Sequence, residues 1–153
     1  PFNAFNILQG LETLALRMER HVENAISIAT HLQNHDQILW VNYAGLQQDR
    51  YHSLAKKICS GKPSAIISFG IEGGEKSGTK FIDALKMIKR LVNIGDAKTL
   101  ACHPASTTHR QLCDEELKRA GVTSDLVRIS VGIEHVDDII ADIDQALAAA
   151  NAS

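Results

Sequence analysis

The sequence has few cysteines, and its charges and apolar residues are not concentrated in any way that points to a specialised class. Only 3 cysteines occur among 153 residues, and they stand far apart. A disulfide framework is therefore not expected, and the thiols are predicted to be reduced. Lys and Arg total 16 against 18 Asp and Glu, which leaves a net charge of -2. This balance provides no basic field for a nucleic-acid backbone, so we expect no nucleic-acid partner.

Long apolar runs and a secretory signal are also missing. The longest apolar runs are far shorter than the roughly 20 residues that a helix needs to span a bilayer. The N-terminus lacks the charged region, apolar stretch and cleavage site of a signal peptide. We therefore expect a cytoplasmic protein with no membrane partner. The chain begins with Pro1 rather than Met, which suggests a piece of a longer protein.

The first 34 residues carry the strongest periodic pattern. Apolar residues from Phe5 to Leu32 recur at steps of three and four, with charged residues in most of the spaces between them. This spacing predicts one long amphipathic helix, weakened at Gly10 by about 1 kcal/mol relative to alanine. A helix of that length would extend roughly 45 Å, longer than a domain of this size needs. It is therefore expected to connect to, or lie along, another body.

Shorter segments alternate after residue 34. Strands are expected at 38–42, 64–69, 91–94, 99–102 and 126–131, some of them only as short candidates. Helices are expected at 49–59, from Ser77 through Ile88, at 114–120 and at 136–150. The pattern predicts an α/β or α+β domain with a small sheet of about four strands and helices on one face.

Several clusters resemble ligand sites without matching one. The glycines at 70, 73, 74 and 78 lack the spacing of a phosphate-binding loop and suit a strand-to-helix turn. His31 and His35 share a helical face but have no further ligand nearby. A second histidine and cysteine set matches no familiar zinc spacing: Cys102, His103, His109 and Cys113. We therefore expect no metal site.

Arg128 is the residue that points most clearly to function. Strand alternation in 126–131 places Val127, Ile129 and Val131 on one face and Arg128 with Ser130 on the other. A guanidinium in so apolar a strand is costly unless it is paired or faces a cleft, where it suits a carboxylate. The residues alone leave an internal salt bridge and a binding site about equally plausible. The segment 93–109, rich in small and hydrogen-bonding residues, is typical of loops that shape a binding site.

Three stretches together resemble the C-terminal domain of the Cys/Met-metabolism family of pyridoxal-phosphate (PLP) enzymes. They are Gly10-Leu11-Glu12-Thr13-Leu14-Ala15-Leu16-Arg17-Met18-Glu19-Arg20-His21, the loop from Gly95-Asp96 through His103-Pro104-Ala105 to Thr108-His109, and Val127-Arg128-Ile129-Ser130-Val131-Gly132-Ile133-Glu134. The resemblance covers essentially the whole chain. It implies the small C-terminal domain of a type I PLP-dependent transferase with a mainly antiparallel sheet. In this reading residues 1–34 link to an absent large PLP domain, and residues 35–153 form the small domain.

The resemblance also implies an activity and site residues. Phe69 to Gly74, the stretch from Asn93 to Lys98 and the Ser106-Thr107-Thr108 form of the loop most resemble the O-acetylhomoserine sulfhydrylase branch. That branch makes homocysteine from O-acetylhomoserine and sulfide in methionine biosynthesis, as a cytoplasmic homotetramer. Arg128 matches the family arginine that binds the α-carboxylate of the amino-acid substrate. Asn93 stands beside that carboxylate, where related enzymes often have serine, and Thr108 matches a threonine lining the site.

The Schiff-base lysine of the family has no clear counterpart. Ser77-Gly78-Thr79-Lys80 resembles its motif, but Lys80 precedes an amphipathic helix pattern and follows the linking segment, in the wrong order. The resemblance thus implies that the cofactor is bound by the absent domain and that this chain alone is inactive. Alternatives are the cystathionine γ-synthase, cystathionine γ-lyase or methionine γ-lyase branches, and an inactive stand-alone binding domain. A purely structural domain, with Arg128 paired internally, is a further alternative.

Overall fold

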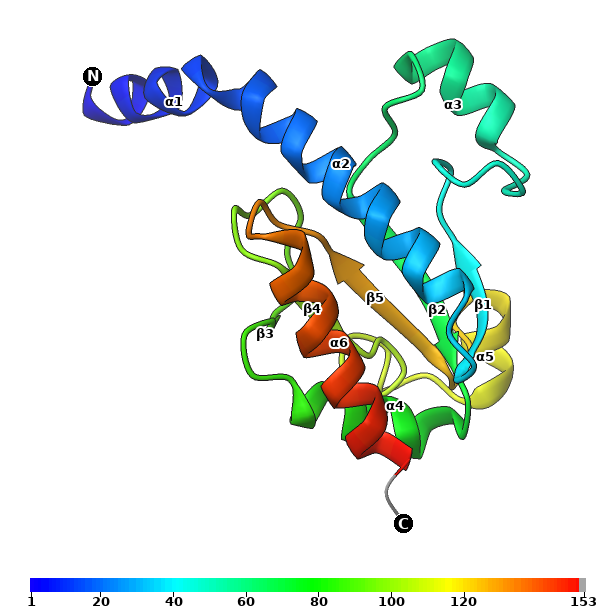
Figure 1. Cartoon of the computed structure of the whole chain (residues 1–153). Coiled ribbons are helices and arrows are strands. Elements are labelled where there is room, and N and C mark those ends of the chain that lie inside the picture. Colours follow the sequence, from blue (N-terminus) through cyan, green and yellow to red (C-terminus); the bar gives the residue numbers. More distant parts are fainter. Residues whose placement is uncertain (152–153) are drawn as a thin grey trace.

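The fold is a mixed sheet with helices packed mainly on one of its faces (Figure 1). A computed structural model describes residues 1–151, apart from the side chain of Asp114. The helices are α1 (Phe2–Glu12), α2 (Leu14–Gln33), α3 (His52–Cys59), α4 (Gly74–Ala84), α5 (Asp114–Arg119) and α6 (Val136–Asn151). The strands are β1 (Ile38–Asn42), β2 (Ile66–Ile71), β3 (Lys89–Arg90), β4 (Leu100–Cys102) and β5 (Leu126–Ser130).

The sheet has the strand order β1-β2-β5-β4-β3, with β5 at its centre. All neighbouring strands are antiparallel except β3 and β4, which are parallel. The register places Arg128 of β5 between Ser68 of β2 and Cys102 of β4. The expected α/β class and mainly antiparallel sheet are confirmed, with five strands where about four were expected.

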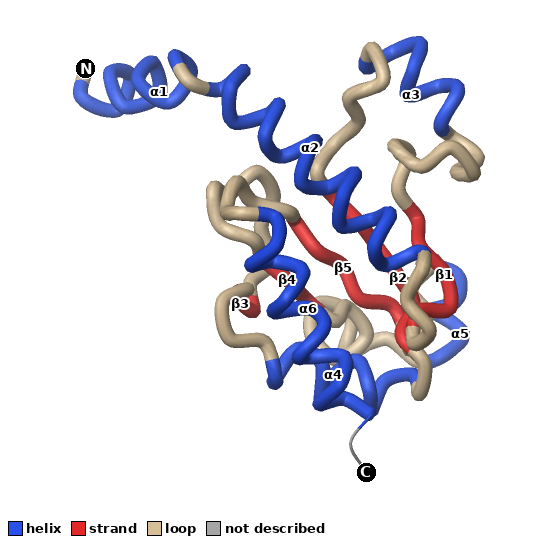
Figure 2. The backbone as a smooth tube through the Cα atoms, viewed as in Figure 1, coloured by secondary structure: helices blue, strands red, loops and turns tan. Residues whose placement is uncertain are grey.

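The two faces of the sheet differ in character because side chains alternate along each strand. Ile67, Phe69, Val127 and Ile129 have no exposed area and belong to the core beneath the helices. Phe69 meets Phe81 of α4 edge to face, with the ring centroids 5.9 Å apart. Figure 2 shows α2 and α6 lying across this face. The opposite face carries the polar side chains of β2, β4 and β5, including Arg128.

The continuous helix expected over residues 1–34 is interrupted at Thr13. Thr13 has φ -107° and ψ 7°, so α1 ends there and α2 begins with the next residue. Arg17 reaches back across the break and donates to the Gly10 carbonyl at 2.9 Å and to the Thr13 hydroxyl. The first of these bonds satisfies a carbonyl that the end of α1 leaves without a helical partner. No residue of α1 is buried, and the helix extends away from the sheet (Figure 1).

Two other helices differ from the expected bounds because side chains capture backbone groups. Asp49 was expected to cap a helix directly, but it accepts from the amides of Tyr43 and Tyr51, and α3 begins three residues later. The helix expected to continue through Ile88 ends at Ala84. Asp142 of α6 accepts from the amides of residues 86–88, which a longer helix would have used. The chain then enters β3, shifted from the strand expected at 91–94.

Within residues 1–151, no helix is both long and apolar enough to cross a bilayer.

Candidate functional site

Arg128 projects from the middle of the central strand with part of its guanidinium unpaired. Its Nε is buried and has no hydrogen-bond partner, while Nη2 donates to the carbonyl oxygen of Asn93 at 3.5 Å. Across the described part of the chain, no carboxylate lies within ion-pair distance of it. A buried donor without a partner is unfavourable, so this nitrogen is poised to bind an acceptor supplied from outside.

A cavity of about 510 Å³ opens beside this guanidinium. Its walls come from β2, β4, β5 and the segments that follow β3, β4 and α5: Ile66, Ser68, Val92, Cys102, Pro104, Thr108, His109, Ala120, Val122, Leu126 and Arg128. The lining is largely apolar, and Arg128 is the one lysine or arginine among these lining residues. Such a pocket suits a small molecule that has one anionic end and an aliphatic remainder.

The thiol nearest to the guanidinium does not neutralise it. Cys102 is 3% exposed and lies directly opposite Arg128 in the β4–β5 ladder. Burial raises the pKa of the Cys102 thiol, and the positive charge of Arg128 offsets this only in part. The thiol therefore stays protonated at neutral pH, and the charge of Arg128 remains available to a ligand.

The two other predicted site residues lie close to this pocket. Thr108 is exposed at the pocket wall, with its hydroxyl 2.8 Å from Nδ1 of His109. Asn93 contributes its backbone carbonyl to Arg128, whereas its side-chain oxygen accepts from the amide of Ile94. The structure thus brings Arg128 and Thr108 to one cavity and places Asn93 at its edge through the main chain.

His103 anchors the loop that carries Thr108. Its ring is 1% exposed, with Nε2 2.9 Å from the Ser124 carbonyl and Nδ1 2.9 Å from the Ser106 hydroxyl. The ring packs against Gly78, where a Cβ atom would come within 2.6 Å of it. Both nitrogens are occupied, so His103 has no free position for a metal. Throughout the described residues, no group of three or more potential ligands is arranged to hold a metal ion.

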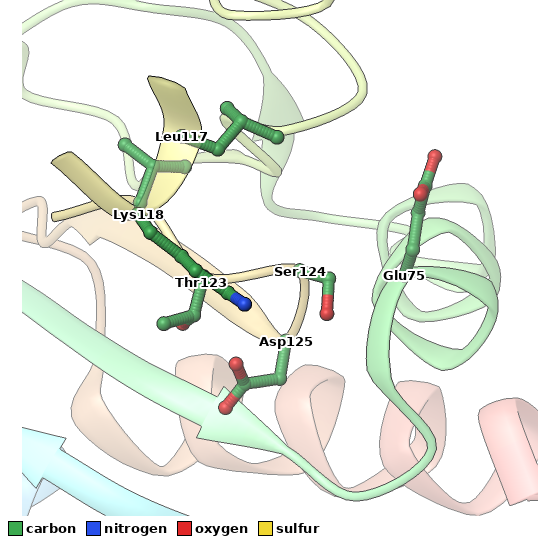
Figure 3. Close-up of a pocket in the computed structure, with 7 residues that line it drawn as sticks. Glu75, Leu117, Lys118, Thr123, Ser124 and Asp125 are labelled. Carbon is green, nitrogen blue, oxygen red and sulfur yellow. The ribbon is translucent and has the colours of Figure 1, made fainter. Parts of the chain in front are cut away.

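A second cavity, of about 580 Å³, lies between α4 and α5 and contains none of the predicted site residues. Figure 3 shows Lys118 extending from α5 over the turn that holds Thr123 and Asp125, with Glu75 standing on α4. The Asp125 carboxylate accepts from the indole nitrogen of Trp40 at 2.8 Å. Charges of both signs line this space, so it has less selectivity for an anion than the Arg128 pocket.

Lys80, whose surrounding sequence resembles the Schiff-base lysine motif, lies on α4 and does not line the Arg128 pocket. Its neighbour Phe81 is buried in the core on the helix-covered side of the sheet, whereas Arg128 projects from the other side. No lysine is among the residues found to line the Arg128 pocket. These residues therefore fit a carboxylate and do not fit a PLP group held covalently.

Comparison with known proteins then decides the family. The model of the Cys/Met metabolism PLP-dependent enzymes matches residues 1–148. The chain belongs to this family.

Two curated relatives match almost the whole of this chain. The chain is 55% identical over 147 residues to a homocysteine synthase of Schizosaccharomyces pombe, covering 96% of the chain and 34% of that protein. It is 51% identical over 148 residues to O-acetyl-L-homoserine sulfhydrylase 1 of Thermus thermophilus, covering 97% of the chain and 35% of that protein. The chain thus spans about a third of the length of the curated relatives it matches.

A solved structure agrees with this membership. It is the crystal structure of a Campylobacter jejuni protein described as a putative O-acetylhomoserine (thiol)-lyase with N'-pyridoxyl-lysine-5'-monophosphate. The TM-score is 0.89 at 43% identity, and the match covers 97% of this chain and 35% of that one. The family resemblance expected from the three motifs is therefore confirmed, and the family is PLP-dependent.

The pocket contains residues that sequence reasoning missed. Ser68 faces Arg128 across the β2–β5 ladder and lines the cavity, and Pro104 forms another part of its wall. The alternation of β2 indicates which face carries Ser68, but a single sequence holds no signal for which strand lies beside it. The anchoring role of His103 likewise depends on Gly78 and Ser124, which are distant in sequence.

Proposed function

We propose that the chain is the C-terminal substrate-binding domain of a sulfhydrylase that makes homocysteine from O-acetylhomoserine and sulfide. The observation that carries the proposal is the buried, unpartnered Nε of Arg128 beside a largely apolar pocket. The names of the relatives at 51–55% identity support the sulfhydrylase branch over the other branches of the family. The match to only about a third of their length supports the assignment to one part of a longer enzyme.

Arg128 is the proposed ligand of the substrate's α-carboxylate. A carboxylate that enters the pocket can accept from the free Nε and from a terminal nitrogen of the same guanidinium, the paired geometry that arginine favours. The Asn93 carbonyl accepts from Nη2 at 3.5 Å, a long bond that favours one orientation of the planar group. Thr108 at the pocket wall is the proposed contact for the rest of the amino acid. The strand therefore fixes the position and orientation of the substrate.

PLP is the proposed cofactor of the full-length protein, and we place it on the part of the enzyme outside this chain. When bound, PLP supplies an electron sink for loss of protons from the amino-acid substrate. The task of this chain is to orient the substrate, which can contribute substantially to rate. Because no lysine is found in the lining of the Arg128 pocket, we expect the isolated chain to be inactive.

Residues 1–34 are proposed to connect this domain to the large PLP domain. The apolar residues of α1 support that role because they are exposed: Phe2, Phe5, Ile7, Leu8 and Leu11. Exposed apolar faces of this kind mark surfaces that pack against another body. We further propose that the full-length enzyme is a cytoplasmic homotetramer, as the family resemblance implies.

The proposal is tested by replacing Arg128 in the full-length enzyme with alanine and with lysine. Truncating one partner of a buried, hydrogen-bonded charge pair costs about 2–4 kcal/mol, so Arg128→Ala should lower kcat/KM for O-acetylhomoserine roughly 30-fold to 1,000-fold. Absorbance of the bound cofactor should stay unchanged. Arg119→Ala, which alters an exposed arginine on α5, is the matched control. Unaltered kinetics of Arg128→Ala would refute the assignment.

A further inference from the structure

A polar cluster, in which three side chains are buried and Glu134 is partly exposed, connects α2 to the end of the strand that carries Arg128. Four side chains form it: His21 and Asn24 of α2, Thr99 just before β4, and Glu134 in the turn after β5. His21 and Asn24 are each 2% exposed, and Thr99 has no exposed area. Buried polar groups of this kind specify a unique arrangement only when their hydrogen bonds are made.

The helix side of the cluster holds the backbone as it leaves β5. Nδ1 of His21 donates to the Val131 carbonyl oxygen at 2.6 Å. Nδ2 of Asn24 donates to the carbonyl oxygens of Gly132 at 3.0 Å and Glu134 at 2.9 Å. Three successive bonds from one helix therefore fix the turn that begins directly after the arginine strand.

The other side of the cluster is centred on Thr99. Its amide and hydroxyl donate to the two oxygens of the Glu134 carboxylate at 2.6 and 2.8 Å. The same hydroxyl accepts from the amide of Gly132 at 2.9 Å, and the Thr99 carbonyl accepts from Lys89. Every polar atom of Thr99 is thus engaged, which fixes the direction of its hydroxyl proton.

Gly132 is required for this geometry. A Cβ atom at this position would come within 2.2 Å of a Glu134 oxygen and within 2.5 Å of the Thr99 amide nitrogen. It would also come within 2.5 Å of the Ala97 carbonyl oxygen. The glycine therefore serves close approach between the turn and the segment before β4.

The cluster reaches the pocket through the loop 93–98. This loop is largely exposed, and it is anchored at both ends. At one end the Asn93 carbonyl accepts from Arg128, and at the other the amide of Ile133 donates to the Ala97 carbonyl at 2.9 Å. Between them, Asp96 accepts from the amide of Lys98 and tightens the turn. The position of Asn93 relative to Arg128 thus depends on how Thr99 is held.

We propose that Glu134 is a positioning residue for the carboxylate site, an inference that rests on the proposed function of Arg128. Through Thr99, Glu134 holds the loop 93–98 so that the Asn93 carbonyl keeps the guanidinium turned toward the pocket. His21 and Asn24 tie the same turn to α2. Neither Glu134 nor Thr99 lines the pocket, so each acts on the ligand through Arg128.

The test uses the full-length enzyme and two matched inert ligands. L-norleucine carries an α-carboxylate, and n-pentylamine has the same chain without it. Glu134→Gln keeps the size of the side chain but replaces an acceptor oxygen with a donor. We expect it to weaken inhibition by norleucine about tenfold, which corresponds to roughly 1.4 kcal/mol, and to leave inhibition by pentylamine within about twofold. KM for O-acetylhomoserine should rise more than kcat falls.

Variants of Thr99 make the test independent of Glu134. Thr99→Ser keeps the hydroxyl and should match the wild type, whereas Thr99→Val keeps the shape and should reproduce the effect of Glu134→Gln. Glu115→Gln, on the exposed surface of α5, is the control for loss of an acidic residue. Equal weakening of both ligands, or no difference between the serine and valine variants, would overturn the proposal.

The Arg128 variants separate this inference from the proposed function. If Arg128→Ala leaves norleucine inhibition unchanged, the proposed carboxylate site is wrong. If Arg128→Ala weakens norleucine inhibition but Glu134→Gln and Thr99→Val do not, only the positioning role is wrong. Cofactor absorbance and melting temperature, measured for every variant, identify changes that come from unfolding.

Discussion

Replacement of Asp142 by asparagine tests what ends α4 and directs the chain toward β3. The Asp142 side chain is 6% exposed and accepts from the amides of Lys86, Met87 and Ile88 at 2.8–2.9 Å. Nε2 of Gln145 donates to it as well, at 3.0 Å. In either orientation of an asparagine side chain, an NH2 group replaces one carboxylate oxygen and faces two other donors.

The expected loss of stability follows from the two hydrogen bonds that the amide group of the asparagine cannot accept. A hydrogen bond to a charged group contributes about 1.5–3 kcal/mol net, and partial relaxation recovers some of that. We expect Asp142→Asn to lower the free energy of unfolding by about 2–4 kcal/mol at pH 7. For a domain of this size, that corresponds to a fall in melting temperature of roughly 5–15 °C. Urea and thermal unfolding of the chain, followed by circular dichroism, measure both quantities.

The pH dependence provides a second readout. Burial by itself would raise the pKa of Asp142, but the bonds from Ile88, Lys86, Met87 and Gln145 outweigh burial and lower the pKa below its usual value. Since the folded-state pKa is the lower one, this stabilisation is complete above the unfolded-state pKa, near pH 4, and is lost as the pH falls through the folded-state value. The difference between wild type and Asp142→Asn should therefore be constant from pH 5 to 8 and shrink below about pH 4.

A matched control distinguishes this role from a general charge effect. Asp83 lies at the end of α4, pairs with Arg90 at 3.3 Å and is well exposed. Such surface pairs contribute little, so Asp83→Asn should change the free energy of unfolding by less than about 1 kcal/mol. A loss for Asp142→Asn as small as that of the control, or a difference that persists undiminished at pH 3, would refute the reasoning.

Two further predictions concern backbone positions. Gly70→Ala places a Cβ atom 2.1 Å from the Trp40 indole nitrogen and 2.2 Å from an Asp125 oxygen, so it should break their hydrogen bond and lower the free energy of unfolding by about 1–3 kcal/mol. Quenching of Trp40 fluorescence by acrylamide should increase; unchanged quenching and stability would contradict this. Ser60, which ends α3 with φ 51°, is in the left-handed region, so Ser60→Gly should raise stability by about 0.5–1 kcal/mol in the same unfolding assay. A decrease would show that the serine side chain has a stabilising role.

The central strand could be predicted from sequence because its signal is local. Alternation in β5 is sufficient to place Val127 and Ile129 in the core and Arg128 on the other face. The strand order could not be predicted, because β5 pairs with segments about 25 and 60 residues away. The parallel pairing of β3 is equally non-local, and its two residues are too few to produce a periodic pattern.

The break at Thr13 and the end of α4 illustrate a different limit. Apolar periodicity continues past both points, so the pattern alone predicts longer helices. What ends them is competition for backbone groups, by Arg17 within the same segment and by Asp142 from a helix more than 50 residues later. Periodicity reports which side of a helix is buried, whereas its ends depend on such contacts.

The candidate site also has features that the sequence predicts and features that depend on distant contacts. From the sequence alone, Arg128 can either pair with an acidic residue or face a cleft, because the outcome depends on where the 18 acidic residues lie in space. Among the acidic residues whose side chains the structure describes, none lies within ion-pair distance of Arg128. The roles of Ser68 and His103 depend on partners that are distant in sequence, so only the three-dimensional structure reveals them.

The break at Thr13 has a consequence for cooperativity. Helix α1 has 11 residues and none is buried, whereas α2 contributes Ala25, Ile28 and Leu32 to the core. A helix of that length has marginal stability in water on its own. The cooperative folding unit of this chain therefore starts after Thr13, and α1 responds to whatever surface it meets. Its helical content is a local reporter of contact with another body, independent of the stability of the sheet.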